Sequence, residues 1–146
     1  MPLALEFLAT LSTVLFCGAA IYVNLVEHPA RMSCGTAIAL AEWAPSYKRA
    51  TLMQAPLAIV GFLCGLGAWI LGSGALWVVG AIAIGLVVPF TFMAIMPTNL
   101  RLLEPGRDPN SAGTRALLDK WAGLHAVRSA LSAIASVIYV VLLVRP

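Results

Sequence analysis

Long runs of apolar residues alternate with short polar segments along the chain, and four of these runs are long enough to cross a membrane. A transmembrane helix needs about 20 mainly apolar residues to span the hydrocarbon of a bilayer. Because every backbone N–H and C=O in lipid must be paired within its own segment, each run is predicted to be a helix. The predicted helices are Leu3–Val26, Leu52–Leu71, Ala75–Met96 and Trp121–Val144.

The segments between these helices indicate how the helices are connected. The segment Gly72–Gly74 is a tight turn, so the second and third helices are predicted to form an antiparallel hairpin. The first connection, residues 29–51, is predicted to contain a short interfacial helix that is broken by Pro45. The last connection turns around Pro105 to Gly113, and an amphipathic helix is expected from about Thr114 into the fourth run.

Small residues recur four positions apart on two of the predicted helices, at Gly61 and Gly65 and at Ser132 and Ser136. This spacing lets helix backbones approach each other closely within a membrane. The pattern therefore predicts an all-α fold, an antiparallel four-helix transmembrane bundle with short interfacial helices in its two long connections. The 146 residues are predicted to form a single integral membrane domain.

The composition agrees with a membrane protein. Hydrophobic residues make up 61% of the chain, charged residues 10%, and the mean hydropathy is +0.95, whereas soluble domains carry about 25% charged residues. No basic run with interleaved aromatic residues indicates a nucleic-acid partner. Cys17, Cys34 and Cys64 have no ligand-like spacing and are predicted to be small packing residues. The expected surroundings are the lipid bilayer, and a homo-oligomer stays an open alternative.

Basic residues concentrate at one end of the predicted bundle. Both long connections fall on the same side, together with all of the nine Lys and Arg residues except Arg145. Lys and Arg near helix ends favour the cytoplasm. The first run lacks the basic segment that precedes a cleaved signal, so it is expected to be a permanent span. We therefore expect a multi-pass protein of the cell membrane with cytoplasmic long connections and both termini outside.

Polar and aromatic side chains from all four helices map to this same end. His28 and His125, the only histidines of the chain, are both there with Glu27. Histidine and carboxylate side chains at one place indicate either a proton-transfer site or a metal site of the two-histidine, one-carboxylate kind. Glu27 and His28 point about 100° apart on a regular helix, so both would bind one metal only if the helix unwinds before Pro29. One pocket is predicted to be lined by His28, Tyr47, Asn99 and His125.

Arg128 lies about two turns inside the fourth helix and shares one helical face with Trp121 and His125. A charge at such a depth costs about 2.5 to 3.5 kcal/mol unless it is paired or hydrated. Glu27 is the expected partner by depth, and a structural ion pair is the alternative to a functional role. Basic residues nearer the helix ends, such as Lys120, are expected to extend to the lipid headgroups.

Short motifs at this end are similar to those of a known family. They are EHPAR (Glu27 to Arg31), W-x-x-x-Y-x-R (Trp43, Tyr47, Arg49) with Gln54, MPTN (Met96 to Asn99) and W-x-x-x-H-x-x-R (Trp121, His125, Arg128). With these motifs the chain resembles, over nearly its whole length, the small four-span membrane proteins of the anthrone oxygenase-like family. Named members of that family act in aromatic polyketide biosynthesis.

The resemblance implies a membrane-embedded monooxygenase-type activity on a flat apolar aromatic substrate of the anthrone kind. Proton abstraction gives an electron-rich anion that reacts with dioxygen, which needs a base and oxyanion stabilisation but no organic cofactor in principle. His125 or His28 would be the base, and Arg128 and Asn99 would stabilise the oxyanion. The substrate-binding residues would be Glu27, Trp43, Tyr47, Arg49, Gln54 and Trp121.

Two other classes of function stay open from the residues alone. One is a membrane protein that binds a small ligand, a haem or a transition metal, with His28, His125 and Glu27 as the metal ligands. The other is a structural or assembly partner without catalysis, which would use the small-residue helix faces. A transporter is not favoured, since no inverted repeat or broken helix pair is evident.

The predicted topology places the turn at Ser73 and the loop at Gly106 on opposite sides of the membrane. We expect Ser73→Cys to react with a membrane-impermeant thiol reagent in intact cells, and Gly106→Cys to react only in inverted vesicles, because positive charge holds the long connections in the cytoplasm. Both substitutions are made after the three native cysteines are replaced. Labelling of both positions from one side would contradict the topology.

Overall fold

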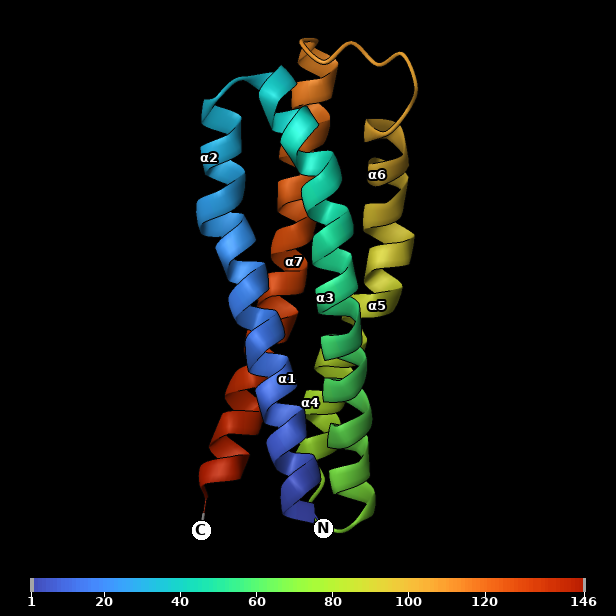
Figure 1. Cartoon of the computed structure of the whole chain (residues 1–146). Helices are drawn as coiled ribbons and strands as arrows, with labels where there is room; N and C mark the ends of the chain where they lie inside the picture. The colour runs from blue at the N-terminus through green and yellow to red at the C-terminus, as the bar shows by residue number, and fades with distance from the viewer. Residues whose placement is uncertain (1, 146) are drawn as a thin grey trace.

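The structure is a computed structural model that describes residues 2–145, and its regular elements in this range are all helices (Figure 1). Successive elements join into four long helices, each long and apolar enough to cross a membrane. They are Pro2–Ser33, Thr36–Ile70, Leu76–Leu102 and Ala112–Val144. The predicted all-α bundle of four membrane-spanning helices is therefore confirmed.

The first and third long helices are built from several elements. The first consists of α1 (Pro2–Tyr22), the π-helical η1 (Val23–Glu27) and α2 (His28–Ser33). The third consists of α4 (Leu76–Gly85), α5 (Val87–Phe90), the π-helical η2 (Thr91–Ile95) and α6 (Met96–Leu102). The second is the single helix α3 (Thr36–Ile70), and the fourth is α7 (Ala112–Val144).

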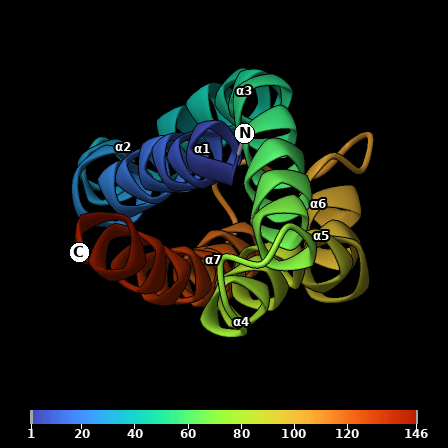
Figure 2. The same cartoon turned by 90° about the horizontal axis from the view of Figure 1, so that it is seen from below.

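The four long helices run up and down around a common axis. Viewed along this axis, α1 packs between α3 and α7, and α4 packs between α3 and α7 on the other side (Figure 2). The start of α1, the end of α7 and the α3–α4 turn lie at one end of the bundle (Figure 1). The α2–α3 and α6–α7 connections lie at the other end, which we call the loop end.

Small residues bring the helices together at the end opposite the loop end. Tyr139 is fully buried there, stacks on Trp77 with 5.0 Å between ring centroids, and donates a hydrogen bond to the Gly61 carbonyl at 3.2 Å. Gly65 has no Cβ, which leaves room for the Tyr139 hydroxyl. Ser136 donates to the Thr13 carbonyl at 3.3 Å. The predicted small-residue faces therefore do pack against neighbouring helices.

The two turns at opposite ends use the residues that such turns require. Gly72 and Gly74 have φ values of 93° and 108°, a region that glycine enters without steric cost. At the loop end the Ser111 side chain caps α7 by accepting a hydrogen bond from the Thr114 backbone N–H at 3.1 Å. The predicted glycine turn is confirmed, and α7 begins at Ala112, close to the predicted start.

The first connection differs from its prediction. A separate interfacial helix broken at Pro45 was expected, but α3 begins at Thr36 and continues through Pro45 and Pro56. A proline inside a helix removes one backbone hydrogen bond and crowds the preceding turn. The N-terminal part of α3 is nevertheless anchored by side-chain burial, since Trp43 is fully buried in the bundle. Packing against the other helices thus outweighs the local cost of the proline.

The two π-helical segments share a relation to proline. Each ends two residues before one, η1 before Pro29 and η2 before Pro97. In these segments the backbone N–H of His28 bonds to the Val23 carbonyl, and that of Met96 bonds to the Thr91 carbonyl, five residues earlier in both cases. Such π turns occur often at functional sites. They change the direction of the side chains within the turn and just after it.

We expect Gly65→Ala to destabilise the fold by about 1 to 3 kcal/mol, the usual cost of overpacking a filled core. A Cβ at Gly65 would lie 1.8 Å from the Tyr139 hydroxyl oxygen. Gly18→Ala is the matched control, because no heavy atom lies within 4 Å of a Cβ built there. Denaturant or thermal unfolding in detergent micelles measures both variants, and equal stability of the two would contradict the close packing.

Candidate functional site

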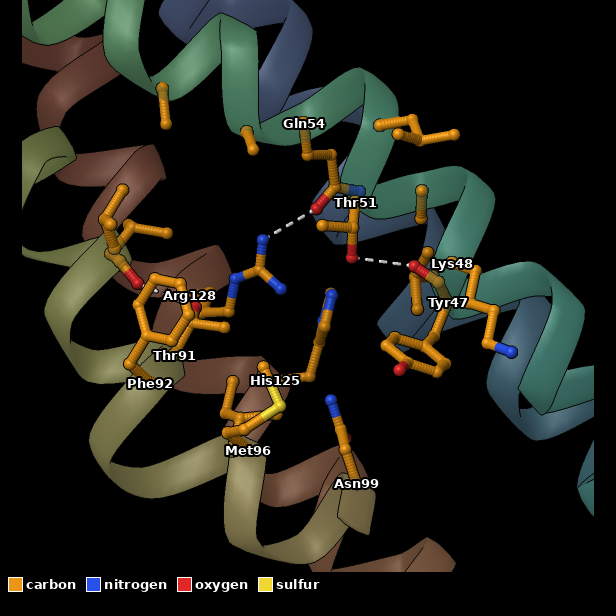
Figure 3. Close-up of a pocket in the computed structure, with 18 of the residues that line it drawn as sticks. Tyr47, Lys48, Thr51, Gln54, Thr91, Phe92, Met96, Asn99, His125 and Arg128 are labelled. Atoms are coloured by element: carbon orange, nitrogen blue, oxygen red, sulfur yellow. Dashed lines mark hydrogen bonds between the residues drawn. The ribbon is translucent and has the colours of Figure 1, made fainter. Parts of the chain in front are cut away.

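A cavity of about 420 Å³ lies inside the bundle, toward the loop end (Figure 3). Its volume is within the range of ordinary small-molecule sites, about 300 to 1,000 Å³. One wall comes from α3, a second from α5, η2 and α6, and a third from α7, while Phe16 of α1 closes it at depth. Most of the lining is apolar, with a few polar groups that face inward.

Six of the ten residues predicted for the site line this cavity. They come from three of the four long helices, as the up-and-down path of the chain implies. They are Tyr47, Gln54, Asn99, Trp121, His125 and Arg128. Their positions agree with the predicted pocket, and their chemical roles stay predictions.

His28 and Trp43 lie behind the cavity wall rather than in its lining. Both pack on Trp121: the ring centroids of His28 and Trp121 are 5.5 Å apart, and those of Trp43 and Trp121 are 5.9 Å apart. Trp43 also stacks on Tyr47 at 4.8 Å. The prediction that His28 lines the pocket is therefore wrong, because Trp121 forms the cavity wall and His28 packs behind it. His28 and Trp43 support the aromatic wall.

Glu27 belongs to a separate ion cluster and does not contact Arg128. Its carboxylate pairs with Arg31 of the next helical turn and accepts a hydrogen bond from Ser46 of α3. The Arg31 Nε also lies 2.6 Å from a carboxylate oxygen of Glu42. Arg31 is 5% exposed, so it is a buried cation with two anionic partners. The expected Glu27–Arg128 pair is wrong, because the nearer Arg31 takes the carboxylate.

Arg128 instead has a neutral partner and faces the cavity (Figure 3). Its Nη2 donates to the Gln54 side-chain oxygen at 2.9 Å, and its Cζ lies 5.4 Å from the Phe16 ring centroid. Within residues 2–145 no carboxylate lies at ion-pair distance from it. A guanidinium held at this depth without an anion is suited to stabilise negative charge on a bound molecule.

His125 is held from behind by a residue to which the sequence pattern assigned no role. Its Nδ1 lies 2.8 Å from the side-chain oxygen of Asn24, which also accepts a hydrogen bond from Ser129 at 2.7 Å. The Asn24 amide nitrogen donates to the Ala122 carbonyl at 3.0 Å. The signal for Asn24 is a lone amide inside an otherwise apolar helix, a position where polar residues are rare and usually paired.

Asn99 lies across the cavity from α3 and near His125 (Figure 3). It is 3% exposed, and its side-chain oxygen has no hydrogen-bond partner among the described residues. Figure 3 shows its amide nitrogen directed toward His125. Together with Arg128, it provides N–H groups on two sides of the histidine.

The predicted metal ligands do not converge. Glu27 pairs with Arg31, while His28 and His125 each pack on Trp121, with centroid distances of 5.5 and 4.9 Å. In the part of the chain that the structure describes, no group of three His, Cys, Asp or Glu side chains could hold a metal ion. The proposed two-histidine, one-carboxylate arrangement of these three residues is therefore wrong. Arg49 is exposed and does not line the cavity either.

The rim of the cavity reaches the apolar outer surface between α3 and η2. Leu52 on α3 is 78% exposed and Phe92 on η2 is 64% exposed, and both line the cavity. On a membrane-spanning bundle, this surface faces the hydrocarbon of the bilayer. The cavity therefore opens sideways, where an apolar molecule dissolved in lipid can enter.

The chain is similar to known proteins in part of its length. The family model described as "Anthrone oxygenase" matches residues 43–138, more than half of the chain, and this range includes every site residue that lines the cavity. The anthrone oxygenase tpcL of Aspergillus fumigatus is 39% identical over 70 residues, which cover 46% of this chain and 44% of that protein. No solved structure matches the chain at a significant level.

We expect Arg31→Ala to destabilise the fold by about 1.5 to 3 kcal/mol, because it removes the buried guanidinium that pairs with the half-buried Glu27 carboxylate. Arg115→Ala, at an exposed position of α7, is the control and should change stability by less than about 0.5 kcal/mol. Unfolding of the purified variants in detergent gives both values. A small effect at Arg31 would show that the ion cluster does not stabilise the fold.

Proposed function

Because this chain belongs to the anthrone oxygenase family, we propose that it oxygenates a flat apolar aromatic substrate of the anthrone type inside the membrane. One observation carries the proposal. A laterally open cavity joins a histidine, an arginine that pairs with no carboxylate of residues 2–145, and aromatic walls. These are the groups that removal of a carbon-bound proton and stabilisation of the resulting oxyanion require.

The proposed reaction converts a methylene group and dioxygen into a carbonyl group and water. The base takes one methylene proton, and the resulting anion gives its electrons to dioxygen as the C–O bond forms. The peroxide oxygen then takes the proton back from the base. Removal of the second methylene proton forms the C=O bond, breaks the O–O bond and releases hydroxide, which leaves as water with that proton. The atoms and charges of the four steps balance without another reactant.

His125 is the proposed base because it faces the cavity and lies among the groups that would contact the substrate (Figure 3). An unprotonated imidazole nitrogen can accept a proton from a bound substrate and return it later, so it can serve in both directions. His28 is not proposed for this role, since it lies outside the cavity lining. It supports Trp121 from behind.

Arg128 and Asn99 are the proposed stabilisers of negative charge. Proton removal places charge on the carbonyl oxygen of an anthrone, and later steps place it on the peroxide. N–H groups that are already oriented lower the energy of such charge without reorganising. Gln54 accepts a hydrogen bond from the Arg128 guanidinium at 2.9 Å, and because no carboxylate in the described part of the chain pairs with Arg128, its charge is available for the substrate.

The substrate would lie against the aromatic wall of the cavity. Tyr47 and Trp121 line this wall, and Trp43 is fixed behind both of them by stacking at 4.8 Å and an edge contact at 5.9 Å. Flat polycyclic molecules pack favourably on such rings. Since an anthrone partitions into lipid, the opening between Leu52 and Phe92 is the proposed route of entry.

We expect His125→Gln to lower the turnover of an anthrone substrate by at least about 100-fold, because the basic nitrogen is lost while much of the side-chain shape remains. Lys120→Gln is the control, since Lys120 is exposed on the same helix and does not line the cavity. Oxygen uptake with purified protein in lipid nanodiscs measures both variants.

The result separates catalysis from binding. If substrate binds to His125→Gln with near-normal affinity but is not turned over, the histidine is part of the chemistry. If both variants turn over substrate at the parental rate, His125 is not the base. If the parent protein binds the substrate but consumes no oxygen, the chain is a binding protein and the proposed oxygenation is wrong.

A further inference from the structure

Asn24 lies in the π-helical turn η1, and its side chain reaches from the first long helix to the fourth. Its side chain contacts three residues of α7 within hydrogen-bonding distance, Ala122, His125 and Ser129. These three are spaced three and four residues apart, so they follow one face of α7. A single amide therefore joins the backbone of α7 to the one histidine that lines the cavity.

The partners of Asn24 determine which end of the amide faces which residue. The Ala122 carbonyl oxygen can only accept a hydrogen bond, so the amide nitrogen of Asn24 faces it at 3.0 Å. The amide oxygen then faces Ser129 and His125, and an amide oxygen can only accept. The nitrogen of His125 that lies 2.8 Å from it must therefore carry a hydrogen.

We propose that Asn24 is a positioning residue that keeps the hydrogen of the His125 imidazole on Nδ1 and directs an unprotonated Nε2 into the cavity. A neutral imidazole carries only one ring hydrogen, so a hydrogen on Nδ1 leaves a free electron pair on Nε2. Among residues 2–145 the Nδ1 contact is the only side-chain hydrogen bond of His125. The nitrogen that could take a proton is thus the one on the cavity side.

An amide suits this task better than a carboxylate would. A carboxylate beside Nδ1 also stabilises the imidazolium, as in serine hydrolases, and so favours the charged form of the ring. The neutral Asn24 selects the tautomer without adding an anion, whose negative charge would offset the positive charge of Arg128. Ser129 shares the amide oxygen at 2.7 Å and so fixes the plane of the amide.

The expected effect on activity rests on the proposed function, in which His125 is the base. The inferred tautomer of His125 does not depend on that function. Loss of the orienting partner of a metal-binding histidine costs about 10- to 100-fold in activity, and we take an effect of this order as the expectation for His125. We therefore expect Asn24→Ala to lower kcat about tenfold or more and to change KM little, because the cavity lining is unaltered.

Nitrogen-15 NMR of protein labelled at histidine tests the tautomer directly. The chain has only two histidines, and His28→Gln assigns the signals of His125. In the parent we expect a protonated Nδ1 and an unprotonated Nε2. In Asn24→Ala we expect signals of both tautomers. Ser136→Ala is the matched control, because it removes a buried hydroxyl of α7 that bonds to Thr13 and does not contact His125.

Each outcome supports or overturns the proposal. A hydrogen on Nε2 in the parent overturns it, and this result needs no variant to fold. An unchanged tautomer in Asn24→Ala also overturns it. If the tautomer changes but oxygen uptake with an anthrone does not, Asn24 positions the ring and His125 is not the base. The failure of the proposed function can in this way be told apart from the failure of the inference.

Discussion

The structure depends on one constraint, that a polar group inside a bilayer must find its partner within the protein. No water is available in the hydrocarbon to satisfy an N–H, a hydroxyl or a charge. The chain meets this requirement almost completely at Arg31, which has two carboxylate partners, and at Asn24, whose amide is bonded at both ends. It leaves the requirement only partly met at Arg128 and Asn99. Both residues line the cavity, where a ligand can supply the missing partner; other buried polar atoms without a hydrogen-bond partner, such as the ring nitrogens of His28, lie outside it.

The two ends of the bundle differ in how closely their helices pack. At the end opposite the loop end, glycines let the helices close around Tyr139, and little space remains. Toward the loop end, two π turns precede Pro29 and Pro97, and the large aromatic residues Trp43 and Trp121 pack between the helices. The first π turn carries Asn24, and the second contributes Phe92 to the rim. Close packing is thus concentrated at one end of the bundle and the cavity lies toward the other.

The sequence pattern predicted the helices and the end at which the site lies, but not all of the side-chain partners. Length and hydrophobicity decide where a membrane helix runs, and the direction of each span decides which end a residue reaches. The rotation of a helix about its axis is decided by packing. Depth alone therefore paired Glu27 with Arg128, although Arg31, one turn from Glu27, lies closer. The same limitation placed His28 in the pocket, whereas Arg49 was placed in the site by the family resemblance, and Pro45 was given more weight than the burial of Trp43 allows.

The proposed chemistry also explains why a cavity open to lipid is sufficient. The base returns each proton that it takes, so the reaction produces no net acid and needs no proton path to either side of the membrane. Dioxygen, an anthrone and the quinone product all dissolve better in hydrocarbon than in water, and the only polar product is one water molecule. His28 and the ion cluster around Arg31 can therefore serve structure alone, behind the wall formed by Trp121. An opening between Leu52 and Phe92 lets both reactants arrive from the bilayer, while the polar groups stay on the inner side of the cavity.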